Sequence, residues 1–244
     1  MTTWIPWKIA RKELKVIGRK KSIIFYTVGL PLLISIVFSL VVKNQTASGI
    51  STSLLSIGIG SIIYIFVILA TVLPSTIAAY SIVGEKVEKT LEPLLATPTT
   101  DGEILLGKGI AAFIPPILST WTGAVIFMAA TDYILYNAGL GYYYFPNWNA
   151  AVMLLLLAPL AGILSIEVAV IASSRVSDVR GANQIAGLMF IPFVAVFFAG
   201  AEGLFTFSTD NLLIFSGVVL VVDVILFFLS KATFKREEIL TKWK

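Results

Sequence analysis

Residues 150–173 read AAVMLLLLAPLAGILSIEVAVIAS, an apolar run in which Glu167 is the one charged side chain. A helix of roughly 20 apolar residues crosses the hydrocarbon core of a bilayer, so this stretch has the length and composition of a membrane span. Similar stretches occur at about 22–42, 52–82, 104–130, 182–201 and 211–230. The sequence therefore predicts an all-α membrane protein, a bundle of six transmembrane helices in which residues 1–244 form a single transmembrane domain.

The composition of the whole chain agrees with a membrane environment. Hydrophobic residues make up 57% of the sequence and charged residues 13%, too little charge to cover the surface of a soluble domain of this size. Cysteine and histidine are absent, which excludes disulfides, thiol nucleophiles, histidine bases and the common zinc and haem ligand sets. The net charge of +4 lies in short runs beside apolar spans, so we expect membrane lipids rather than nucleic acid as its partner.

The distribution of basic residues predicts the orientation. All of the 18 Lys and Arg residues except Lys43 lie before the first span, after the second, after the fourth or after the last. Cytoplasmic loops carry the excess of positive charge in membrane proteins. We therefore expect both termini in the cytoplasm, an even number of spans, and a location in the plasma or inner membrane.

Residues 1–21 have the pattern of an amphipathic helix. Trp7, Ala10, Leu14 and Ile17 recur on one stripe, and basic side chains occupy the other, namely Lys8, Arg11, Lys12, Lys15 and Arg19. A helix of this kind lies in the plane of the membrane interface, with its apolar side toward the acyl chains. We expect an interfacial helix along the inner leaflet.

A narrow helix face is predicted on the fourth span. Small side chains recur at every fourth position, at Ala161, Ser165, Ala169 and Ser173. Such stripes let two membrane helices approach closely, so this face should meet another helix of the same or of a neighbouring subunit.

The main charged loop between spans is residues 85–98, EKVEKTLEPLLATP. Val87, Leu91, Leu94 and Leu95 recur at helical spacing, and acidic and basic side chains lie between them, which predicts a short amphipathic helix in the cytoplasm. Residues 102–108 have the glycine and lysine spacing of a phosphate-binding loop. Gly109 stands where that loop needs Ser or Thr, and no strand precedes it, so nucleotide binding is not expected here.

The sequence EKVEKTLEPLLATP and the downstream EILLGK at 103–108 resemble the permease subunits of type-2 ATP-binding cassette (ABC) exporters. The stretches SSRVSDVRGANQ at 173–184 and FKREEIL at 234–240 are similar to the same family. The resemblance implies that this chain is the permease of an ATP-driven exporter and is not itself an enzyme. It further implies that the loop is a coupling helix, with these residues in the contact: Glu85, Lys86, Glu88, Thr90, Leu91, Glu92, Leu94 and Leu95.

The resemblance also implies the partners. Two separate cytoplasmic ATPase subunits would bind ATP and magnesium, while this chain would hold no cofactor or metal. A second permease subunit, identical or different, would complete the transporter. The transported substrate stays open, because an apolar span face suits lipids, peptides, drugs, polysaccharides and ions alike.

Two acids lie inside predicted spans, Glu167 in the fourth and Asp223 in the sixth. Buried carboxylates require a partner or a water-filled cavity, and both lie at a similar depth, roughly 10–12 Å from the cytoplasmic boundary. Three alternatives follow: a buried polar cluster that includes Lys108, the lining of a substrate path, or proton coupling. The last would make the chain a proton- or ion-coupled secondary transporter, the main rival to the ABC permease.

Overall fold

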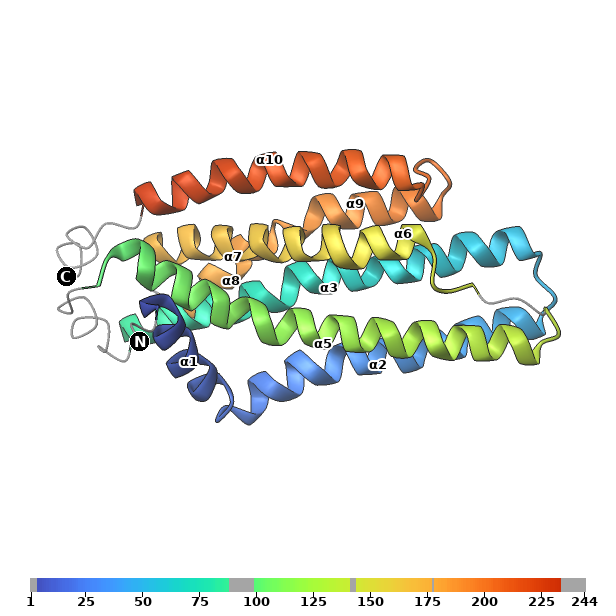
Figure 1. Cartoon of the computed structure of the whole chain (residues 1–244), viewed down its shortest axis with the longest axis horizontal. Helices are drawn as coiled ribbons and strands as arrows, with labels where there is room; N and C mark the ends of the chain where they lie inside the picture. Colours follow the sequence, from blue (N-terminus) through green and yellow to red (C-terminus); the bar gives the residue numbers. More distant parts are fainter. Residues whose placement is uncertain (1–3, 88–98, 141–143, 177, 234–244) are drawn as a thin grey trace.

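A computed structural model of the chain describes residues 4–87, 99–140, 144–176 and 178–233. Within these residues it is all helical, and six helices are long and apolar enough to cross a membrane, which confirms the predicted bundle. Figure 1 shows an elongated bundle whose long helices run along one axis. The helices are α1 (Ile5–Ile17), α2 (Lys21–Ala47), α3 (Thr52–Val87), α5 (Asp101–Asn137), α6 (Trp148–Ala151), the π-helix η1 (Val152–Leu157), α7 (Ala158–Arg175), α8 (Val179–Gly187), α9 (Phe190–Ala201) and α10 (Thr209–Thr233).

The start of the first helix and the end of the last lie at the same end of the bundle. In Figure 1, α1 crosses that end obliquely, and α10 finishes beside it. The bundle therefore has an even number of crossings, as predicted. We call this the α1 end and the other the far end.

The third span is longer than predicted. We expected it to finish near residue 130, but α5 has 37 residues and continues to Asn137. At 1.5 Å per residue it is about 55 Å long, well beyond a hydrocarbon core of about 30 Å. The helix starts with a capping box between Thr100 and Glu103 and ends before Gly139, whose φ of 78° suits a glycine. Its limits are thus set by caps rather than by hydropathy.

The centre of the bundle is the pair α3 and α7, which form the most extensive helix contact in the described part of the chain. The predicted small-residue stripe is fully buried on α7. Beside it, a Cβ added at Gly162 would lie 3.2 Å from the Ala70 carbonyl oxygen of α3. The narrow face therefore meets a helix of the same chain.

The fourth span is one column made of α6, η1 and α7. Pro159 has no N–H to donate to the preceding turn, which leaves carbonyl groups there without their usual partner. The Trp121 indole N–H of α5 donates to one of them, the Leu154 carbonyl oxygen in η1, at 2.7 Å. A side chain from a neighbouring helix thus supports the π-helical turn.

The predicted fifth span is present, but it consists of two helical segments rather than one regular α-helix. α8 ends at Gly187 and α9 begins at Phe190, and between them Leu188 and Met189 keep α-region backbone angles but donate to the carbonyl three residues back, so the helix tightens into a turn. Gly187 is a weak helix former, and Pro192 in the first turn of α9 needs no N–H partner, so both residues favour a new start here.

The peripheral helices have apolar outer surfaces. Only about a fifth of the most apolar windows of α2, α8–α9 and α10 is buried, against 61% and 67% in the spans that contain α3 and α7. The exposed side chains of α10 include Leu213, Ile214 and Phe228. Such a surface suits hydrocarbon or another apolar subunit.

Candidate functional site

The helix α1 docks against the start of α5. Its buried residues are Pro6, Ala10, Glu13 and Ile17. The two backbones approach so closely at Gly107 that an added Cβ would lie 2.7 Å from Ile9 Cβ and 2.8 Å from the Pro6 carbonyl oxygen. The glycine of the apparent phosphate-binding motif therefore makes room for α1.

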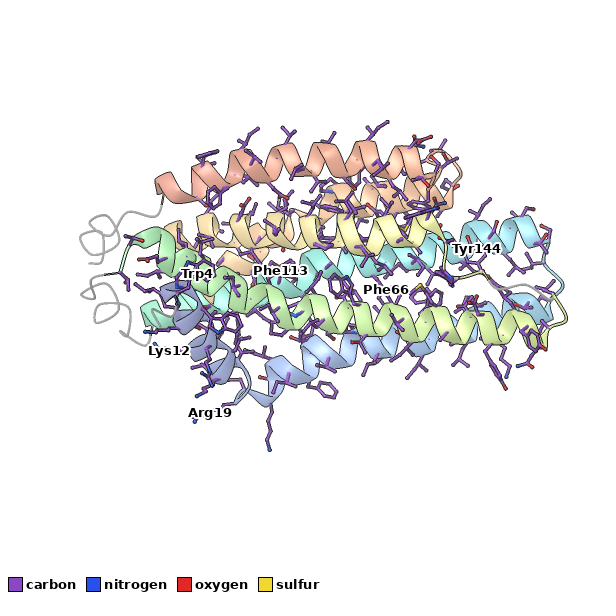
Figure 2. All side chains as sticks on the ribbon, in the orientation of Figure 1. Trp4, Lys12, Arg19, Phe66, Phe113 and Tyr144 are labelled. Atoms are coloured by element: carbon purple, nitrogen blue, oxygen red, sulfur yellow. The ribbon has the colours of Figure 1, made fainter. Side chains whose placement is uncertain are left out.

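The exposed side of α1 agrees only in part with the predicted stripes. Ala10 and Ile17 are buried as expected, but Trp7 is 46% exposed. Figure 2 shows Lys12 and Arg19 on the outer side of α1, away from the bundle. The apolar stripe thus packs on α5, and Trp7 lies at its edge. Contact with an inner leaflet stays a prediction.

A buried ion pair fastens α1 to the bundle. The Lys108 ammonium of α5 lies 3.3 Å from Glu13 Oε1, and the side chains are 3% and 8% exposed. Lys108 also donates to the Ser81 carbonyl oxygen at 2.9 Å and lies 3.1 Å from Ser81 Oγ. Ser81 Oγ donates in turn to Glu13 Oε2 at 3.2 Å. We call Glu13, Ser81 and Lys108 the anchor cluster.

The anchor cluster joins three elements at the α1 end. Ser81 lies in the last two turns of α3, and Lys108 lies in the second turn of α5. These two helices lead into and out of the loop that was predicted to contact an ATPase. A second contact nearby places the Lys20 ammonium 4.0 Å from the centroid of the Tyr80 ring of α3. Movement of either helix at this end must therefore also move or break the contact with α1.

The residues predicted to couple to an ATPase are placed only in small part. Residues 85–87 continue the α3 helix. Residues 88–98 lie outside the described residues. The predicted coupling helix therefore stays a prediction, as does the role of its residues: Glu85, Lys86, Glu88, Thr90, Leu91, Glu92, Leu94 and Leu95.

Glu167 of α7 and Asp223 of α10 lie together, and Lys108 lies apart from them in the anchor cluster. Glu167 is 8% exposed and Asp223 is 5% exposed, and the two carboxylates are close enough to interact electrostatically. Glu167 Oε2 and both Asp223 carboxylate oxygens are buried and have no hydrogen-bond partner in the described part of the chain. The ammonium of Lys108, which was expected beside these acids, instead forms an ion pair with Glu13.

Glu167 faces a pocket of about 630 Å³ between α5, α7 and α10. The walls are mainly apolar and include Leu105, Ile110, Phe113 and Phe227. Among the described lining residues Glu167 is the only charged one. Among the described residues the two acids are thus buried without a basic partner.

Comparison with protein families now identifies the chain. A family model described as "ABC-2 family transporter protein" matches residues 7–234, which include most of α1 and all six spans. The chain belongs to the ABC-2 transporter family. No individual curated protein matches it. As an ABC-2 permease it is a multi-pass membrane subunit that serves transport and is not itself catalytic.

Sequence reasoning missed Glu13 in this ABC-2 permease. The signal was present, because Glu13 is the single acid in the basic segment before the first span and falls between Ala10 and Ile17 on the apolar stripe. An acid on a buried face needs a buried cation. Lys108 was singled out, but as a possible partner of Glu167 and Asp223 rather than of Glu13.

Proposed function

We propose that this chain is the permease subunit of an ATP-driven exporter and is coupled to a separate cytoplasmic ATPase through residues 85–98. In the complete transporter, two ATPase subunits bind ATP and magnesium, and two permease subunits, identical or different, form the substrate path. Both termini lie in the cytoplasm, which makes the α1 end the cytoplasmic end. This orientation is supported by the placement of the basic residues.

The anchor cluster carries this proposal. The last turns of α3 and the first turns of α5 flank the loop, and Ser81 and Lys108 hold both helices to α1 through hydrogen bonds and an ion pair. A force on the loop therefore acts on two spans at once and is resisted by a third element. Such an arrangement passes movement of a cytoplasmic partner to the membrane helices, because packed helices shift as units.

The test removes an apolar contact of the loop and reverses one of its charges. Leu91→Asp removes an apolar contact worth about 1–3 kcal/mol at an interface, and Glu92→Lys reverses a charge that would pair with basic residues of the ATPase. We expect the double variant to insert and fold but to lose co-purification with its ABC ATPase partner. Asp210→Lys, a charge reversal at the far end, is the matched control and should keep the ATPase.

Retention of the ATPase and of permease-stimulated ATP hydrolysis by the double variant would contradict coupling through this loop. The rival function, a secondary transporter that uses Glu167 and Asp223, needs no ATPase. Ion-driven transport by the purified permease alone in vesicles would support that rival and overturn the ATP-driven one.

A further inference from the structure

The pocket between α5, α7 and α10 combines apolar walls with an acid that has no counter-charge among the described side chains. We infer that it binds a lipophilic organic cation, with the positive group beside Glu167 and the apolar part against α5 and α10. This inference rests on the proposed transport function and names the chemical class of a ligand for it. Three observations support it: the charge of the pocket, the apolar and aromatic residues of its walls, and its opening on the outer surface of the bundle.

The charge of the site selects a cation. Glu167 lines the pocket, and Asp223 of α10, which is not part of the lining, is close enough for the two carboxylates to repel each other when both are ionised. In the described part of the chain, three of their four oxygens are buried without a hydrogen-bond partner. A carboxyl group buried in an apolar environment stays ionised only beside a positive partner and otherwise takes up a proton. A bound cation supplies that partner, whereas an anion would add a third negative charge.

The walls of the pocket select an apolar or aromatic body. Phe113 and Phe227 contribute rings, which attract cations over their faces in addition to apolar contact. Gly109 also lines the pocket, and an added Cβ there would be in van der Waals contact with Ile166 Cγ2 at 3.8 Å, so the glycine leaves that volume to a ligand. The volume of about 630 Å³ falls within the range of pockets that hold small organic molecules. Inorganic cations prefer several oxygen ligands, which these walls do not offer.

Access to the pocket is lateral. Leu106 and Phe227 belong to its lining and are each 43% exposed, so they mark a mouth on the outer surface of the bundle. Gly102 and Ser230, near the α1 ends of α5 and α10, also line it. In the proposed orientation this mouth faces the inner leaflet, where amphipathic cations concentrate. A ligand of this class therefore reaches Glu167 from the membrane without crossing water inside the protein.

The test compares two probes of nearly the same shape and opposite charge. Tetraphenylphosphonium is a permanent lipophilic cation, and tetraphenylborate is the matching anion. Equilibrium binding is measured on the purified full-length permease in lipid nanodiscs, with empty nanodiscs subtracted. We expect saturable binding of tetraphenylphosphonium and no saturable binding of tetraphenylborate.

Variants then locate the site. Glu167→Gln and Asp223→Asn should each weaken tetraphenylphosphonium binding on the order of tenfold or more, as for loss of a charged partner. Asp132→Asn removes a carboxylate at the far end and should bind like the wild type. If Glu167→Gln fails to yield monodisperse protein, Glu167→Asp and Glu167→Asn decide, because they share a size and only the first keeps the charge and should keep binding.

Three results would overturn the inference: no saturable tetraphenylphosphonium binding, equal binding of tetraphenylborate, or unchanged binding by the charge-removing variants. The assay contains no ATPase, and co-purification of the ATPase is measured separately. If tetraphenylphosphonium does not bind but the ATPase still co-purifies, the proposed ligand class is wrong and the proposed transport function stands. Saturable cation binding, together with failure of the wild-type permease to co-purify with any ABC ATPase, would overturn the proposed coupling and leave the cation site standing.

Discussion

Removing the ammonium of Lys108 should be far more harmful than removing an ordinary lysine. In Lys108→Met, the Glu13 carboxylate stays buried and, among the described residues, keeps only the Ser81 hydroxyl as a partner. Breaking a buried ion pair by deleting one member costs about 3–5 kcal/mol. For a chain of this size each kcal/mol shifts the melting temperature by about 2–4 °C, so we expect a loss of roughly 6–20 °C.

The assay is thermal unfolding of the purified permease, followed by size-exclusion chromatography after heating. Lys43→Met is the matched control, since Lys43 is exposed on α2 and its loss should leave the melting temperature within about 2 °C. The double variant Glu13→Gln with Lys108→Met removes both charges and should recover most of the loss. A Lys108→Met protein as stable as the control, or a double variant worse than both single variants, would refute the anchor cluster as described.

Three further predictions use other parts of the structure. Gly107→Ala should displace α1 and lower the melting temperature, whereas Gly217→Ala, with open space around its Cβ, should not; equal effects would contradict the close approach of α1. Trp121→Phe should cost about 1–3 kcal/mol in the same unfolding assay, because a carbonyl of η1 loses its donor inside the membrane. Finally, the chain has no cysteine, so single cysteines at Lys12 and Ser48 test orientation: an impermeant thiol reagent added outside cells should label only the second, and labelling of the first would reverse the proposed topology.

Much of the fold could be predicted because the bilayer imposes a simple rule on sequence. Apolar length fixed the existence of all six spans, and the spacing of small residues on the fourth correctly indicated a closely packed face. The positions at which helices end or are interrupted were harder to predict. The extension of α5 to Asn137 depends on a glycine with positive φ, and the break in the fifth span depends on local backbone preferences that hydropathy does not register.

The candidate sites were predicted less well than the fold. The similar depth of Glu167 and Asp223 could be predicted because rise per residue is fixed in a helix, whereas their shared role stays a prediction. The partner of Lys108 was not predictable in this way. It comes from α1, which docks at an angle on the bundle, and no periodicity in one helix reports where another helix crosses it.

The anchor cluster also has a consequence for the order in which the protein is made. Glu13 precedes Ser81 by 68 residues and Lys108 by 95. At roughly 5–20 residues per second, its cation is synthesised about 5–20 s later. During that interval α1 has no docking surface, and its acid must stay in water or at the interface. The first helix to leave the ribosome is therefore among the later ones to reach its final position. It can dock only after the third span, which contains Lys108, has been inserted.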